Sequence, residues 1–159
     1  HTKTVEPHPV YTIETDKWTK ASYDLGILKV YTDDIDESEF NGIFPKLIPK
    51  SNIDESKNNE CYIYGYPGDS DKIGQLWGMK GNFKFYIPKQ TNTMRPAIYY
   101  ENIDTTGGQA GAPILTHDFC ILGIHTMGDD FHNKRNWGCV LTVDKIKFIN
   151  DVIKKTESD

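Results

Sequence analysis

Several features are missing from this sequence of 159 residues, and their absence excludes whole classes of protein. No stretch approaches 18 consecutive apolar residues, so we expect no membrane-spanning helix. The chain has 23 acidic residues against 18 Lys and Arg, which argues against a general nucleic-acid binder. No CxxC pair, phosphate-binding loop or cofactor motif is present, so we expect neither a metal site nor a cofactor.

Cysteine is also scarce, with Cys61, Cys120 and Cys139 as the only three. Each lies in an apolar run, which favours buried, reduced thiols. An odd number allows at most one internal disulfide, and the sequence does not decide whether one forms. The chain begins with His1 rather than Met, so we expect a processed, trimmed or partial chain.

Short apolar runs separated by turn residues make up most of the chain. We expect strands within residues 21–31, 60–68, 77–88, 97–106, 112–115, 119–128 and 137–143. The run at 77–88 reads as a strand, a glycine bend and a second strand. Short strands at this spacing are typical of an all-β sandwich or barrel.

The end of the chain differs from the rest. The segment "VDKIKFINDVIKK" (143–155) has the spacing of an amphipathic helix. Its expected apolar stripe is Val143, Ile146, Ile149, Val152 and Ile153. The sequence therefore predicts an all-β fold with one C-terminal α-helix.

A loop rich in small residues, "GGQAGAP" (107–113), allows its backbone to approach another group closely. Three further motifs accompany it: "GYPGD" (65–69), "LGIHTMG" (122–128) and "WGCVLTV" (137–143). In order and spacing they resemble the glutamyl endopeptidases, which are chymotrypsin-fold serine proteases. The resemblance covers roughly residues 11–155.

This resemblance implies a chymotrypsin-like double β-barrel, with a complete C-terminal barrel and a partial N-terminal barrel. We expect four regions along the chain. They are the last strands of the N-terminal barrel at 1–32, a connector at 33–59, the C-terminal barrel at 60–142, and the helix and tail at 143–159.

The resemblance also assigns roles to five residues. Asp24 matches the triad aspartate, which orients a histidine. Ala110 occupies the nucleophile position, and the backbone N–H groups of Gly108 and residue 110 would form the oxyanion hole. Thr105 and His125 match the residues that line the pocket for an acidic substrate side chain.

Each assignment has an ordinary alternative. Asp24 also suits the polar start of a strand, and His125 also suits a core position on a strand. The glycines at 107–111 also suit a simple turn.

The triad histidine is the clearest absence. In the template it precedes the aspartate by about 45 residues. Only His1 and His8 precede Asp24 here, and both lie too near it and outside the expected sequence context. His8 stands between Pro7 and Pro9, which predicts an extended surface segment. Most of the first barrel is therefore absent from this chain.

The resulting hypothesis is a serine endopeptidase that cleaves after acidic residues and is inactive because Ala110 replaces the serine. The alternative is a natural pseudoprotease that acts as a binding or structural subunit of a larger assembly. The expected partners are a polypeptide with an acidic residue and another chain or precursor segment that supplies the N-terminal barrel. We expect no nucleic-acid or membrane partner, and a secreted or extracellular location.

Overall fold

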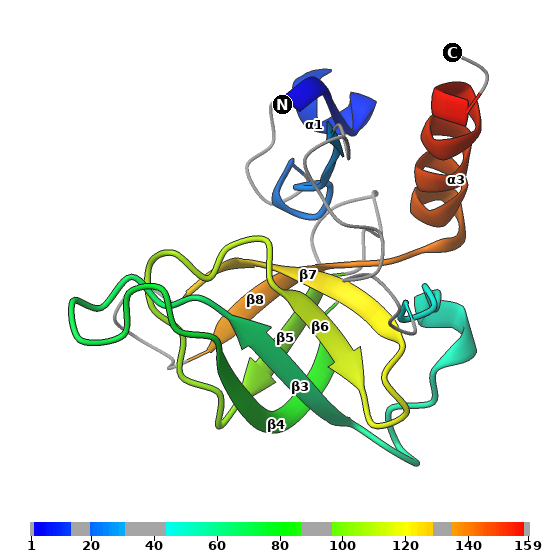
Figure 1. Cartoon of the computed structure of the whole chain (residues 1–159). Helices are drawn as coiled ribbons and strands as arrows, with labels where there is room; N and C mark the ends of the chain where they lie inside the picture. The colour runs from blue at the N-terminus through cyan, green and yellow to red at the C-terminus, as the bar shows by residue number, and fades with distance from the viewer. Residues whose placement is uncertain (1, 14–19, 31–43, 87–96, 129–134, 158–159) are drawn as a thin grey trace.

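The computed structural model describes residues 2–13, 20–30, 44–86, 97–128 and 135–157. Figure 1 shows a β-barrel and, above it, an N-terminal part that lies beside the C-terminal helix. Asp24 belongs to the N-terminal part, whereas the other candidate functional residues belong to the barrel and its loops.

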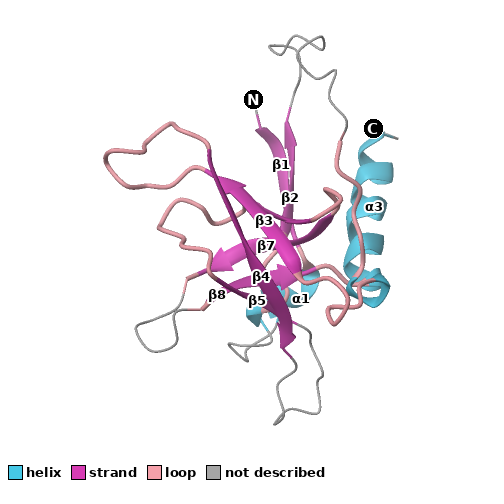
Figure 2. Ribbon diagram, turned by 90° about the horizontal axis from the view of Figure 1, so that it is seen from below, coloured by secondary structure: helices cyan, strands magenta, loops and turns pink. Residues whose placement is uncertain are grey.

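Six antiparallel strands close the barrel in the order β3-β4-β5-β8-β7-β6, and β6 pairs with β3 to complete it (Figure 2). The elements of this region are β3 Glu60–Gly65, β4 Trp77–Tyr86, β5 Ala97–Glu101, β6 Pro113–Thr116, β7 Ile121–Met127, β8 Asn136–Val140 and the helix α3 Val143–Glu157. Because each barrel strand has a partner on both sides, the barrel has no unpaired edge.

Side chains alternate between the inside and the outside of the barrel, and those on the inside form its core. Strand β3 buries every second residue, namely Cys61, Ile63 and Gly65. The core comprises Cys61, Ile63, Phe83, Ile98, Tyr100, Ile103, Ala112, Ile114, Leu122 and Val140. The predicted all-β fold with a terminal helix is thus confirmed.

All three cysteines are free thiols. Cys61 and Cys139 are fully buried, and Cys120 is half-buried. Burial raises the pKa of the Cys61 thiol to about 12. Such a buried, protonated thiol is a poor nucleophile, so its contribution is to packing.

Strand β4 differs from the prediction of two strands joined by a glycine bend. It runs without interruption from Trp77 to Tyr86. Gly81 lies in its middle, where a Cβ atom would be 2.4 Å from the carbonyl oxygen of Glu101 on β5. The glycine therefore permits close approach of the neighbouring strand within one continuous strand.

The N-terminal part contains β1 (Thr2–Pro7), the short helix α1 (Pro9–Ile13) and β2 (Gly26–Val30). Strands β1 and β2 form an antiparallel two-stranded sheet. The strand predicted over 21–31 is therefore shorter, because Ser22 and Tyr23 form a turn and the strand begins only at Gly26.

His8 is buried, so the predicted surface segment is wrong at this residue. Its side chain is 7% exposed, and its ring lies 4.6 Å from that of Tyr23 and 4.8 Å from that of Phe148 on α3. Nδ1 accepts the N–H of Val10 at 3.2 Å. Burial lowers the pKa of His8, and the nearby charge of Lys145 lowers it further. Pro7 ends β1 and Pro9 begins α1, and the ring of His8 between them packs against Tyr23 and Phe148.

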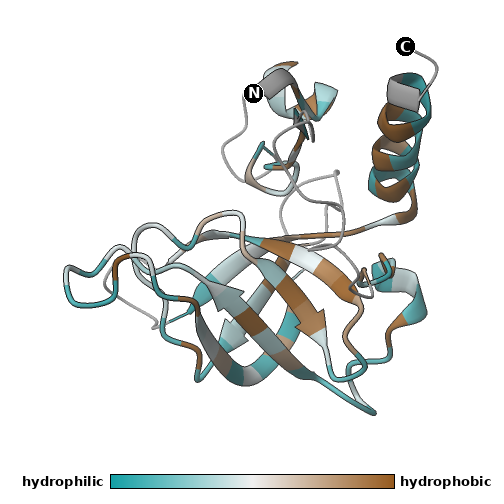
Figure 3. Ribbon diagram, viewed as in Figure 1, coloured by the Kyte–Doolittle hydropathy of each residue, from teal (hydrophilic) through white to brown (hydrophobic). Residues whose placement is uncertain are grey.

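The predicted apolar stripe of α3 is correct only in part. Val143 and Ile153 are 65% and 46% exposed, whereas Lys145 is 1% exposed. Figure 3 shows hydrophobic and hydrophilic residues on different sides of this helix. The Lys145 ammonium donates to the carbonyl oxygens of Ser22 and, at 2.8 Å, Val140. These bonds compensate for the burial of a charged group that the periodicity assigns to solvent.

The described part of the predicted connector, residues 44–59, contacts the barrel at the start of strand β7. Leu47 forms a parallel bridge with Ile121, and the Ile48 N–H donates to the Ile121 carbonyl at 2.9 Å. The short 3₁₀ helix η2 (Lys50–Asn52) follows. Residues 33–43 lie outside the described residues, and the boundaries of the four regions stay predictions.

Candidate active site

The loop at 107–111 requires glycine for two separate reasons. Gly108 has φ +100° and Gly111 has φ +92°, which are left-handed conformations that side chains resist. A Cβ on Gly108 would also lie 3.0 Å from the Gly68 nitrogen and 3.1 Å from the Tyr66 carbonyl oxygen. The Gly68 N–H donates to the Gly107 carbonyl at 2.7 Å, so the two loops are joined through their backbones.

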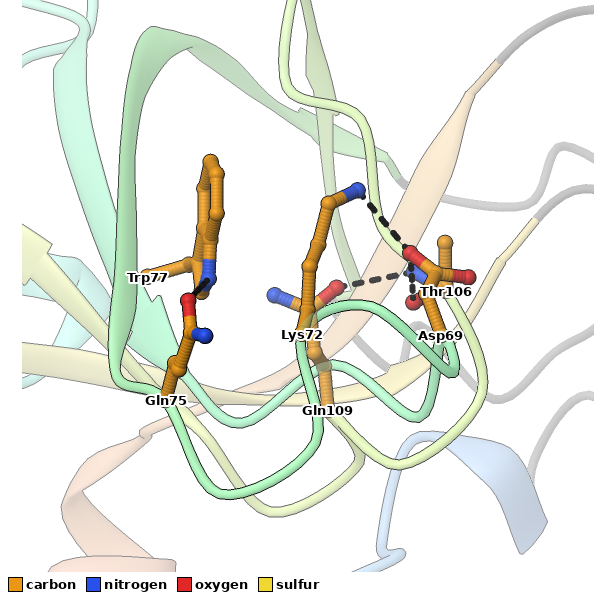
Figure 4. Close-up of polar contacts among 6 residues, drawn as sticks. All are labelled: Asp69, Lys72, Gln75, Trp77, Thr106 and Gln109. Atoms are coloured by element: carbon orange, nitrogen blue, oxygen red, sulfur yellow. Dashed lines mark hydrogen bonds and ion pairs between the residues drawn. The ribbon is translucent and has the colours of Figure 1, made fainter.

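Polar contacts fix the start of this loop (Figure 4). Gln109 is buried, and its Oε1 accepts the N–H of Thr106 at 2.8 Å. The Thr106 hydroxyl donates to Asp69 Oδ2 at 3.4 Å. The buried Gln109 side chain therefore fixes the backbone at Thr106, and Gln109 directly precedes the position that matches the nucleophile.

Ala110 lies exposed at the tip of the loop. On its C-terminal side, the Gly111 N–H donates to the His125 carbonyl and the His125 N–H donates to the Ala112 carbonyl, both at 2.8 Å. In the part of the chain that the structure describes, the N–H groups of Gly108 and Ala110 have no protein acceptor. Two such donors in an exposed loop are available to a ligand oxygen.

His125 points into the barrel and is 3% exposed. Its Nδ1 is hydrogen-bonded to the Tyr100 hydroxyl, which also contacts the Trp137 carbonyl at 3.2 Å. Burial lowers the pKa of His125, partly offset by a hydrogen bond to the Trp137 backbone. Burial raises the pKa of Tyr100. Both side chains are therefore uncharged at neutral pH. A histidine with a purely structural place in the core would be uncharged as well.

Thr105 belongs to a second polar group. Its hydroxyl donates to Asn136 Oδ1 at 2.6 Å, and the Asn136 amide donates to the Ile103 carbonyl at 2.6 Å. A Cβ on Gly128 would lie 3.2 Å from Asn136 Oδ1 and 3.8 Å from the Thr105 hydroxyl. Gly128 thus leaves space beside both polar atoms.

These groups meet at the start of β8. The Asn136 side chain accepts a hydrogen bond from Thr105. The carbonyl of the next residue, Trp137, accepts hydrogen bonds from the side chains of Tyr100 and His125. Because His125 also bonds to the loop that carries Ala110, four of the five predicted site residues lie around one end of the barrel. Their chemical roles stay predictions.

Asp24 lies apart, in the N-terminal part just before β2. Partial burial raises its pKa, and Lys20 acts in the opposite direction. Its charge contributes to raising the pKa of Cys139 on β8, although burial is the main cause. Among the described residues, no hydrogen bond joins Asp24 to a histidine.

Sequence reasoning did not identify Tyr100, Asn136 and Gln109 as residues that support the site. Tyr100 lies two residues after Ile98 and shares its buried face of β5, which predicts only that Tyr100 faces the core. The partners of Asn136 and Gln109 depend on loop geometry. No pattern in the sequence signals these contacts.

Over the described ranges, no group of three or more His, Cys, Asp or Glu side chains is placed to hold a metal ion. The same residues include no helix with the length and hydropathy needed to cross a membrane.

Comparison with known sequences finds glutamyl endopeptidases. The protein of that name from Staphylococcus aureus strain MW2 is 25% identical over 154 residues, covering 91% of this chain. The corresponding protein of strain MRSA252 is 25% identical over 122 residues, covering 77% of this chain. The chain spans 44% and 31% of the length of these two relatives. No family model matches the chain.

Solved structures give the same fold. A Glu endopeptidase in complex with MPD has a TM-score of 0.67 and 22% identity over 95% of this chain and 62% of its own. A thermostable serine protease from an extremophilic microorganism has a TM-score of 0.61 and 14% identity over 92% of this chain and 63% of its own. This chain therefore has a chymotrypsin-type fold and is similar to glutamyl endopeptidases.

Proposed function

We propose that this chain is the substrate-binding part of a trypsin-like serine endopeptidase of the glutamyl type, inactive because Ala110 occupies the nucleophile position. The observation that carries the proposal is the loop at 107–111. It keeps two left-handed glycines and two unpaired N–H groups around residue 110. A simple turn would not require both glycine conformations and close packing against Gly68.

The chemistry of the proposal follows from each group. The N–H groups of Gly108 and Ala110 bind the oxygen of a peptide carbonyl. The Ala110 methyl has neither a lone pair nor a transferable proton, so it cannot form an acyl-enzyme. Asp24 would orient a histidine that this chain does not supply among its described residues. The chain thus binds a peptide without cleaving it.

The alternative function is a pseudoprotease that serves as a binding or structural subunit. It is favoured by the combination of two separate defects, Ala110 and the missing histidine beside Asp24. Both functions share the peptide-binding surface, so peptide binding is the property to test first.

Peptides that end in glutamate are expected to bind about tenfold or more tightly than those that end in glutamine. A charge-assisted hydrogen bond contributes about 1.5–3 kcal/mol. Because burial lowers the pKa of His125, the free imidazole is neutral at pH 7. Its protonated fraction grows as the pH falls from 7.5 to 5, while the peptide carboxylate stays largely ionised. Glutamate affinity should therefore rise over this range. Fluorescence anisotropy measures it.

Three controls accompany this measurement. Thr105→Val should reduce the preference and Thr105→Ser should keep it. His125→Gln should remove the pH dependence. Mass spectrometry should recover every peptide intact. Equal affinity for the two peptides at pH 5.5 would refute the acidic preference, and cleavage would refute the inactivity.

We further propose that another polypeptide covers the β1–β2 sheet and supplies the missing N-terminal barrel. Val5 and Leu28 are partners in the strand register and are 64% and 54% exposed. Leu25 is 6% exposed and is therefore already buried. The apolar surface that remains for a partner is smaller than the sequence predicts. The side chain of Val30 lies outside the described residues.

Sedimentation tests this partner. The chain alone is expected to self-associate at tens of micromolar, because exposed paired hydrophobic residues and free strand edges favour association. Val5→Ser combined with Leu28→Ser should suppress it. A strictly monomeric parent chain that also fails to bind a hydrophobic dye would contradict the proposal.

The resemblance also supports a secreted or extracellular location as part of the proposal. Retention of the full-length protein inside its native cells would contradict it.

A further inference from the structure

The loop between β3 and β4 displays hydrophobic side chains that the barrel core does not use. Tyr66, Ile73, Leu76 and Trp77 are 57%, 69%, 59% and 44% exposed. We call these four residues the apolar patch. Since they fall within twelve residues of one loop and its adjoining strand end, they are concentrated rather than scattered, and such concentrations mark interaction surfaces.

The loop that carries the patch is held in one shape. Lys72 pairs with Asp69 at 3.0 Å, and its ammonium lies 5.2 Å from the centre of the Trp77 ring. The Trp77 indole N–H donates to the Gln75 side chain at 3.3 Å (Figure 4). The Lys72 N–H donates to the Asp69 carbonyl at 2.9 Å. A surface fixed before binding loses less entropy when a ligand docks.

The patch continues directly from the loop that carries Ala110. Gly68 bonds to Gly107, and the Tyr66 carbonyl packs against Gly108. After residue 110, the Gly111 N–H of the same loop donates to the His125 carbonyl. Residue 110 therefore belongs to a loop that is bonded through Gly107 to the loop with the apolar patch and through Gly111 to the backbone of the candidate acidic-side-chain site.

Charges around the patch define the chemistry of its partner. The hydrogen bond and charge of Asp69 raise the pKa of Lys72, and the charges of Asp71 and Asp104 raise it further. Asp71 and Asp104 are exposed. Among the described residues that act on Lys72, carboxylates therefore outnumber the ammonium, which favours a ligand that carries positive charge.

We propose that the apolar patch binds a stretch of polypeptide in which hydrophobic residues are followed by Lys or Arg, adjoining an acidic residue held near His125. The hydrophobic residues pack on Ile73, Leu76 and Trp77, and the basic residues pair with Asp71 and Asp104. This inference rests on the proposed function for the position of the acidic residue, but the patch has its own test.

The test compares three fluorescent peptides by anisotropy. They are acetyl-Ala-Ala-Glu-amide, the same peptide extended by Leu-Leu-Arg-Arg, and the same peptide preceded by Arg-Arg-Leu-Leu. One of the two longer peptides should bind at least about tenfold more tightly than the short one, because two leucines leave water. Which of the two longer peptides binds more tightly shows the direction in which the bound peptide runs. Equal binding of all three would overturn the proposal.

Matched variants locate the effect. Ile73→Ser combined with Leu76→Ser should remove most of the gain and leave binding of the short peptide unchanged. Asp71→Asn combined with Asp104→Asn should reduce the gain about threefold and flatten its salt dependence. Ile153→Ser, an exposed isoleucine on α3, is the control and should change nothing.

The outcomes separate the two proposals. A gain that survives Ile73→Ser/Leu76→Ser overturns the patch, whatever the short peptide does. A gain that those substitutions remove supports the patch, even if glutamate and glutamine peptides bind equally and the acidic preference fails. A dimer in sedimentation that the same substitutions abolish would assign the patch to self-association instead.

Discussion

Replacing Lys145 with alanine is expected to lower the free energy of unfolding by about 3 kcal/mol. The substitution removes the Lys145 donor from the buried Ser22 and Val140 carbonyl oxygens, although the Cys139 thiol, a weak donor, still bonds to Ser22 at 3.1 Å. An unsatisfied buried group costs about 1–3 kcal/mol. The lost side-chain volume adds a cavity. For a chain of this length the change corresponds to a fall in melting temperature of roughly 6–12 °C. Thermal and urea unfolding measure it.

Two variants separate the causes of this loss. Lys145→Met keeps most of the volume and removes only the donor, so its effect should be smaller than that of alanine. Lys147→Ala removes an exposed ion pair with Asp151 and should change the free energy of unfolding little, because solvent screens such a pair. Hydrogen exchange should show the loss locally, at the His8 amide that bonds to Leu25. An alanine variant as stable as the parent would mean that Lys145 does not hold the two parts together.

Gly108→Ala is expected to cost about 2–3 kcal/mol and to abolish peptide binding. Alanine resists φ +100°, and its Cβ would meet the Gly68 nitrogen at 3.0 Å. The atoms that this Cβ would meet, the Gly68 nitrogen and the Tyr66 carbonyl oxygen, both belong to the backbone, so relief requires the 107–111 loop to move away from the β3–β4 loop. The N–H of residue 108 then loses its direction. Calorimetry and peptide anisotropy follow the two effects separately.

Neighbouring glycines give a graded control series. Gly111→Ala meets an unfavourable φ of +92° but no atom within 4 Å, so it should cost about 1 kcal/mol. Gly107→Ala meets neither obstacle and should be almost neutral. If Gly107→Ala impaired binding as strongly as Gly108→Ala, crowding at the ligand rather than loop geometry would be the cause.

What the sequence predicts well is local. Alternating apolar residues determine the barrel strands, and the glycines at 107–111 mark a loop that needs unusual backbone conformations. The nucleophile role of position 110 stays a prediction, which rests on the resemblance of its neighbours to a protease motif. These inferences require only residues that are close together in the chain.

What the sequence does not predict depends on contacts between distant segments. The bond from Lys145 to Ser22 joins residues 123 apart, and it turns a lysine that periodicity places in water into the most buried residue of α3. His8 is buried for the same reason, by Phe148. From the sequence alone, Gly81 indicates a bend. In the structure it leaves space for the neighbouring strand β5, whose position the sequence does not show.

The closure of the barrel has a consequence for assembly. Every strand pairing within it joins residues between Glu60 and Val140. The barrel is therefore a self-contained module, complete in its own hydrogen-bond ladder before any N-terminal strand is added. A further chain that covers the β1–β2 sheet, as proposed above, would therefore bind without opening any strand pairing of the barrel.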